Sequence, residues 1–110
     1  MRESDVEMNL SRLSNDQRIN FLSSLAHQLT ICSRAAYLEP DAEKSCNKLR
    51  AFNEIQHNVT GQLTHLLAND HKWYSDSDLV AILFGKARDE DCEKDLIWAF
   101  EFAFRHLQPG

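Results

Sequence analysis

Residues that form tight turns are scarce in this chain, and their scarcity limits what it can fold into. The 110 residues include only 3 Gly and 2 Pro, and one of each forms the final dipeptide. An all-β domain of this length needs many tight turns, which Gly and Pro usually supply. The sequence therefore predicts an all-α domain, with one hydrophobic core for a chain of this size.

The first long helix is expected to begin after Ser14. Ser14 and Gln17 have the spacing of a capping box, in which two side chains satisfy backbone N–H groups at a helix start. Apolar residues then recur at intervals of three and four, which is the period of a helix. These residues are Leu22, Leu25, Leu29, Cys32 and Ala36. Proline disfavours helical geometry in the residue before it, so the helix ends before Pro40.

A second long helix is predicted over residues 40–69, antiparallel to the first, with Pro40 in its first turn. Its apolar positions are Leu49, Phe52, Val59, Leu63 and Leu66, and Ile55 widens this stripe. Gly61 lies inside the helix and should cost up to about 1 kcal/mol relative to Ala, unless a neighbouring segment must come close.

Two further helices complete the expected four-helix, bundle-like domain. Ser75 and Asp78 have the spacing of another cap, which starts a short helix over 76–86. The last helix is rich in aromatic residues, opens on Asp89-Glu90-Asp91 and closes on Arg105-His106, so its charges suit the helix dipole. Aromatic residues alternate along it with the period of a strand, but a lone strand has no partner in this chain.

The chain is expected to divide into a segment 1–13, a single helical domain 14–107 and a tail 108–110. Ser4 and Glu7 have cap spacing, so the first segment is a possible short helix carrying Val6, Leu10 and Leu13. The predicted core is Leu22, Leu25, Leu29, Leu49, Phe52, Val59, Leu63, Leu66, Leu79, Ile82, Leu83, Leu96, Phe100 and Phe104.

Composition restricts the class of partner. The 12 Lys and Arg against 17 Asp and Glu give a net charge of −5, which argues against binding nucleic acid or an anionic membrane. The 3 cysteines lack Cys-x-x-Cys spacing, so neither a disulfide framework nor a Cys-rich metal site is expected. The N-terminus lacks the apolar core of a signal peptide, and a cytoplasmic location is the default expectation.

Charge is missing from the middle of both long helices. Arg34 is the only formally charged residue between Ile19 and Leu38, and Glu54 is the only one between Ala51 and Asn69. Neutral polar side chains can be buried when they find hydrogen-bond partners, whereas charged groups are far costlier to bury. We therefore expect a second copy to cover these helices in a homodimer. The alternative is that Ser, Thr, Asn and Gln face water.

The last helix carries aromatic residues outside its apolar face. Trp98 and Phe102 lie beyond a polar strip, which favours a subunit contact or a ligand pocket. Alternatively, the N-terminal segment folds over them. Trp73 either packs across the base of the last two helices or anchors a partner. The residues assigned to an interface are Ile55, Gly61, Trp73, Trp98 and Phe102.

One polar cluster is a candidate ligand site. Arg50, Asn53, Glu54 and His57 share a helical flank, and His27 of the first helix completes a possible cleft. Histidine can act as an acid or base near pH 7, and arginine can hold an anion. No activated nucleophile accompanies them, so no catalytic residue is assigned. Glu54 and His57 form only one Glu-x-x-His step where a ferritin-like metal site needs two, and no metal or cofactor is expected.

These features lead to two hypotheses. The first is a small soluble helical interaction or regulatory protein without catalytic activity. It would form a homodimer, and its acidic surface would suit a basic protein partner. The alternative is a small-ligand-binding protein or an enzyme that uses the cleft at Arg50, Glu54, His57 and His27.

Overall fold

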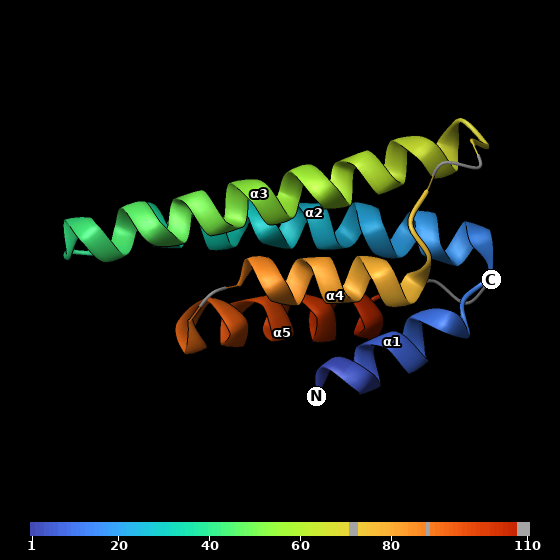
Figure 1. Ribbon diagram of the computed structural model, residues 1–110, viewed down its shortest axis with the longest axis horizontal. Helices are drawn as coiled ribbons and strands as arrows, with labels where there is room; N and C mark the ends of the chain where they lie inside the picture. Colours follow the sequence, from blue (N-terminus) through green and yellow to red (C-terminus); the bar gives the residue numbers. More distant parts are fainter. Residues whose placement is uncertain (71–72, 88, 108–110) are drawn as a thin grey trace.

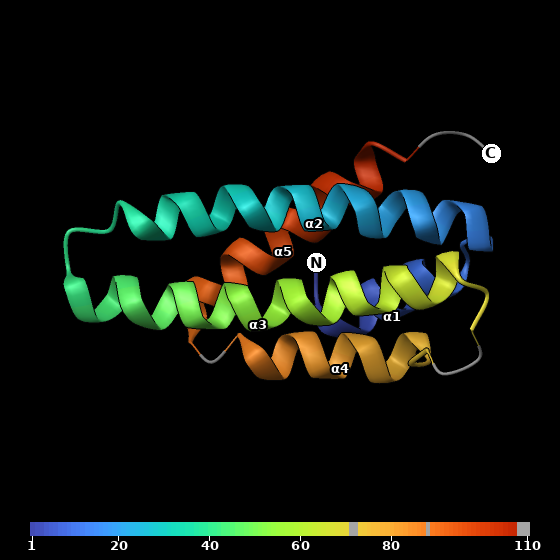
Figure 2. The same ribbon diagram turned by 90° about the horizontal axis from the view of Figure 1, so that it is seen from above.

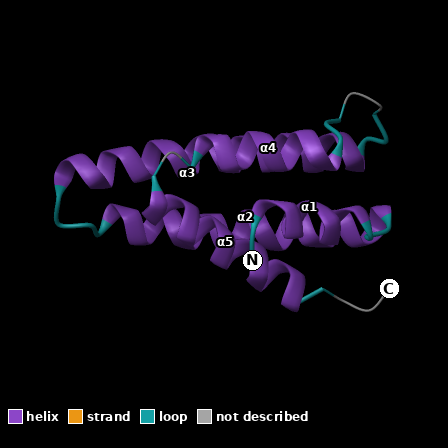
Figure 3. Ribbon diagram, turned by 60° about the horizontal axis from the view of Figure 1, so that its bottom comes forward, coloured by secondary structure: helices purple, strands orange, loops and turns teal. Residues whose placement is uncertain are grey.

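The computed structural model describes residues 1–70, 73–87 and 89–107, and over these ranges it contains helices and no strand (Figure 1, Figure 3). The helices are α1 (Glu3–Ser11), α2 (Asn15–Tyr37), α3 (Ala42–Leu67), α4 (Asp76–Lys86) and α5 (Glu90–Arg105). The predicted all-α fold with two long helices, a short one and an aromatic-rich last helix is confirmed. The possible N-terminal helix is formed as well. The predicted tail 108–110 lies outside the described residues.

The helices form two layers. The long helices α2 and α3 run antiparallel and make one layer, while α1, α4 and α5 lie on the other side (Figure 1, Figure 2). Within this arrangement α5 packs across α2, α4 packs along α3, and α1 packs against α4. Over the described residues, no helix combines the length and the apolar character needed to cross a membrane.

Polar caps start the helices where the sequence offers a short side chain. Ser14 and Gln17 form the predicted capping box of α2. The Asp41 carboxylate accepts hydrogen bonds from the backbone N–H groups of Glu43 and Lys44, at 3.0 and 3.2 Å. Asp41 therefore caps α3, and the placement of Pro40 inside that helix was wrong. A carboxylate satisfies two of the otherwise unpaired N–H groups, which proline in the first turn cannot do.

The start of α1 also differs from the prediction. Its N-cap is Arg2, and the backbone N–H of Arg2 donates to the Asp5 carboxylate at 2.9 Å. The Ser4–Glu7 cap was therefore wrong, because the helix already includes Ser4. An acidic group three residues into a helix suits the positive end of the helix dipole.

Most predicted core residues are buried, and the core extends further than predicted. Leu49, Leu63, Leu66 and Phe104 are partly buried against it, and Ile82 is only half-buried. The predicted core did not include Val6, Leu10 and Phe21, which are almost completely buried. The Phe21 ring stacks on Phe100 with centroids 6.0 Å apart and contacts Phe104 at 4.4 Å. Helix α1 therefore belongs to the same core as the rest of the chain.

Part of the charge-poor surface is covered by the chain itself. Gln62 is 5% exposed, and its side chain both accepts from the Tyr74 N–H at 2.9 Å and donates to the Tyr74 carbonyl at 2.7 Å. Gln56 donates to the Ala26 carbonyl at 3.1 Å and to the Thr30 hydroxyl at 2.7 Å. The side-chain amides of both glutamines therefore find hydrogen-bond partners without a second copy of the chain. Other polar residues of α3 remain exposed. The exposed ones are Asn53, His57, Thr60 and Thr64.

Replacing Gln62 should destabilise the fold. Gln62→Ala removes two hydrogen bonds to the part-buried backbone groups of Tyr74, and each such bond contributes about 0.5–1.5 kcal/mol. Chemical denaturation measures the free energy of unfolding. The matched control is Thr64→Ala on the exposed side of the same helix, which should change it by less than about 0.5 kcal/mol. Equal effects of the two substitutions would contradict the role of Gln62.

Replacing Gly61 should have the opposite effect. A Cβ atom built on Gly61 meets no atom of a neighbouring described segment within 4 Å. Nothing in the part of the chain that the structure describes therefore requires glycine there, and Gly61→Ala should stabilise α3 by about 0.5–1 kcal/mol through helix propensity. Thermal and chemical denaturation check this. A loss of stability would point to a close contact at Gly61 that the single chain does not contain.

Candidate functional site

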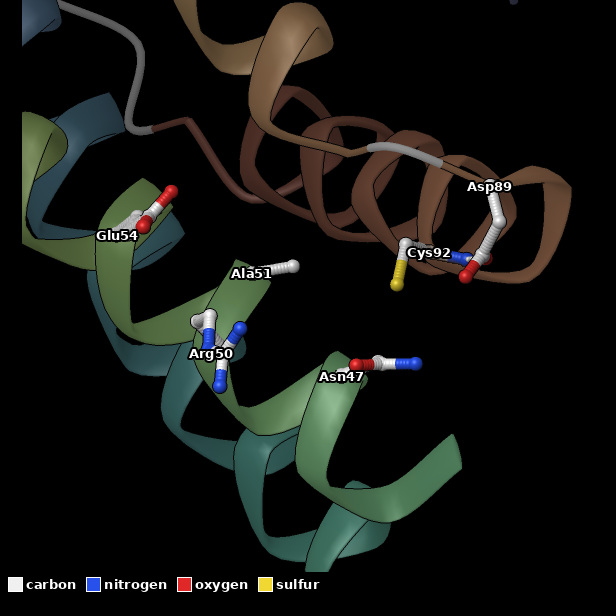
Figure 4. A pocket seen from close by; sticks show the side chains of 6 residues that line it. All are labelled: Asn47, Arg50, Ala51, Glu54, Asp89 and Cys92. Atoms are coloured by element: carbon white, nitrogen blue, oxygen red, sulfur yellow. Dashed lines mark hydrogen bonds between the residues drawn. The ribbon is translucent and has the colours of Figure 1, made fainter. Parts of the chain in front are cut away.

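A hollow of about 310 Å³ lies between α3 and the start of α5 (Figure 4). It is lined by Asn47, Arg50, Ala51, Glu54, Asp89 and Cys92. The four residues from α3 occupy positions i, i+3, i+4 and i+7, so they share one helical face. Ala51 in the middle carries only a methyl group, and the side chains around it leave the space open.

The α5 side of the hollow is fixed by its helix cap. The Asp89 carboxylate accepts from the backbone N–H of Cys92 at 2.8 Å. This bond holds the first turn of α5 and keeps Cys92 against α3, where its side chain is 1% exposed. Asp89 thus places one carboxylate at the hollow by the same interaction that starts the helix.

The structure divides the predicted ligand cluster. Arg50 and Glu54 line the hollow together, while Asn53, Glu54 and His57 border a second, shallower depression with Asn58 and Lys86. His27 is exposed on α2 and lines neither of the two. Asn47, Asp89, Cys92 and Lys86 were not among the predicted site residues. Three of these four residues come from α4 or the start of α5. They were missed because the spacing of residues along α3 does not indicate which helix packs opposite it.

The two charged residues of α3 at the hollow have different surroundings. The Glu54 carboxylate forms an ion pair with the Lys86 ammonium group at 3.6 Å, which links α3 to α4. Arg50 is exposed and has no hydrogen bond or ion pair with another described residue. An unpaired guanidinium at the edge of a hollow can bind a carboxylate or phosphate through two parallel hydrogen bonds.

The cysteine at the hollow is unsuited to nucleophilic chemistry. Burial raises the pKa of Cys92 to about 12, and the nearby charge of Asp89 and its hydrogen bond with the thiol act in the same direction. Burial, followed by the charge of Asp95, raises the pKa of Cys32 to about 11. The thiolate is the reactive form, so both thiols are protonated and inert near neutral pH. Among the described residues no group of three or more His, Cys, Asp or Glu has the arrangement of a metal site.

The predicted interface residues also separate. Ile55 is completely buried in the core of this chain, so its assignment to an interface was wrong. Gly61 and Trp73 are half-buried, and Trp73 borders a depression together with Arg18 and Tyr74. Trp98 is 47% exposed, and its ring lies 5.9 Å from the half-buried Phe102.

Comparisons with known proteins add no relative to this description: the chain matches no protein-family model, no curated protein and no solved structure.

The thiols should differ sharply in reactivity. Of the three cysteines only Cys46 is exposed. In the folded protein at pH 8 a chromogenic disulfide reagent should therefore modify one thiol rapidly, and Cys46→Ser should remove this fast phase. Cys32 and Cys92 should react only after unfolding, since their raised pKa values keep the thiolate scarce at this pH. A second fast thiol in the Cys46→Ser protein would contradict the assignment.

Proposed function

We propose that this chain is a non-catalytic interaction protein that self-associates as a homodimer through the outer face of α5. The observation that carries the proposal is the exposure of Trp98, 47% of whose surface is open to solvent in the single chain. Tryptophan is the residue most enriched among the energetic centres of protein interfaces, because it buries a large apolar area on binding.

The surroundings of Trp98 also support a contact site. Trp98, Phe102 and His106 form what we term the aromatic row, with successive ring centroids 5.9 and 4.1 Å apart. These rings already pack against one another, so little further side-chain order has to be imposed when a partner binds. The net charge of −5 additionally favours a basic protein over an acidic one as any second partner.

Light scattering coupled to size exclusion tests the proposal. We expect the mass of two chains at micromolar concentration. Trp98→Ala should raise the dissociation constant of the dimer at least about 30-fold, which corresponds to a loss of about 2 kcal/mol of binding free energy. The matched control is Leu67→Ala, because Leu67 is also a large exposed apolar residue, at the end of α3. A wild-type mass of one chain up to about 100 μM would refute self-association of useful strength.

A small-ligand-binding protein is the second candidate function, because Arg50 has no partner among the described residues and borders the hollow with Glu54 and Asp89. Under this hypothesis a small anion such as phosphate or acetate raises the melting temperature, and Arg50→Gln abolishes the rise. Arg34→Gln, which removes an exposed arginine from α2, serves as the control. An equal response of both variants would exclude Arg50 as the anion site.

A further inference from the structure

The outer face of α5 carries charges in a regular order around Trp98. Asp91 lies seven residues before Trp98 and Arg105 lies seven residues after it. Seven residues make nearly two turns of helix, so all three side chains share one face. Lys94 and Glu101 flank Trp98 at the edge of the same face. Leaving aside the partly buried Asp95, which lies at the opposite edge of this face, the order of charges along the helix is negative, positive, Trp98, negative, positive.

Most of these charges are available to a partner. Asp91, Lys94 and Arg105 are exposed, and none of them forms an ion pair with another described residue. Glu101 contacts the N-terminal ammonium group of Met1 at 3.5 Å and its side chain remains 38% exposed. The view from above shows α5 running obliquely under α2, with its C-terminal end extending past it (Figure 2). Arg105 is the last residue of α5 and is exposed.

Asp91 and Arg105, at equal distances before and after Trp98, carry opposite charges, and so do Lys94 and Glu101 at nearly equal distances. This relation selects one partner and one orientation. If a second α5 lies antiparallel with Trp98 at the centre, Asp91 faces Arg105 of the second copy, and Lys94 faces Glu101 of the second copy. A parallel arrangement places like charges together instead, which is unfavourable. A two-fold dimer requires one surface to be complementary to itself, and this surface meets that requirement. A uniformly basic partner would meet Lys94 and Arg105 with like charge.

We infer that two copies of the chain pair through antiparallel α5 helices, with Trp98 of each copy packed on the two-fold axis and the Asp91–Arg105 pair formed twice. This inference rests on the proposed function, and it adds the contact residues and their orientation. The helix dipoles of the two α5 helices are also opposed in this arrangement, and each acidic first turn lies beside a basic last turn.

Charge reversal tests the orientation. Asp91→Arg and Arg105→Glu should each weaken the dimer about tenfold, since each creates two pairs of like charges. The double variant restores opposite charges between copies, so its dissociation constant should return to within about threefold of wild type. The two residues are fourteen positions apart in one helix, about 21 Å, so they cannot compensate within one chain. A double variant as weak as the single ones would overturn the antiparallel pairing.

Matched controls separate this contact from effects on the helix itself. Glu43→Arg reverses an acidic charge in the first turn of α3 and is the control for Asp91→Arg in α5. Arg34→Glu reverses a basic charge in the last turn of α2 and is the control for Arg105→Glu in α5. Both controls should leave dimer dissociation unchanged, and circular dichroism should show all variants folded.

The outcomes of this experiment and of the scattering experiment are distinguishable. A monomeric wild type refutes the proposed function and this inference together. A dimer that is insensitive to Trp98→Ala places the contact elsewhere on the chain. A dimer that needs Trp98 but shows no rescue in the double variant leaves the proposed function standing and overturns the antiparallel pairing alone.

Discussion

The packing of phenylalanine rings between α2, α4 and α5 is the interaction on which the rest of the structure depends. Phe100 stacks on Phe21 from α2 at 6.0 Å and on Phe84 from α4 at 5.7 Å, so one side chain joins three helices. This stack also fixes the rotation of α5. Residues two positions from Phe100 point about 200° away from it. Trp98 and Phe102 therefore face outward as a direct consequence of what holds the core together.

Most features that depend on neighbours in sequence could be predicted, although the starts of α1 and α3 were predicted wrongly. Features that depend on which helix packs opposite could not be predicted. The cap at Ser14 needs only Gln17 three residues later, and the charged ends of α5 need only its own dipole. Ile55 was assigned to an interface because the pattern within one helix does not reveal which of its residues the other helices cover. At the candidate site the same limit applies: Arg50 and Glu54 share a face of α3, but Asp89 and Cys92 reach them only through tertiary packing.

The scarcity of charge on α2 and α3 now has a partial explanation within one chain. Gln62 satisfies both backbone groups of Tyr74, and Gln56 connects α3 to α2, so neutral amides serve where a buried charge would be too costly. Not every buried polar atom is matched: Gln28 Oε1 and Ser33 Oγ have no hydrogen-bond partner among the described residues. Other polar residues of α3, among them Asn53, Thr60 and Thr64, are exposed in the single chain.

The energetics of association also favour α5 over the long helices as the contact proposed here. Covering the exposed side chains of Asn53, Thr60 and Thr64 removes polar groups from water, and each must regain a hydrogen bond for the contact merely to break even. Covering Trp98 removes apolar surface, at about 25 cal/mol for each Å². Opposite charges at the edges of this contact determine the orientation of the two copies more than the affinity between them, because exposed ion pairs contribute little net free energy. The aromatic row therefore determines whether copies associate, and the charges around it determine how.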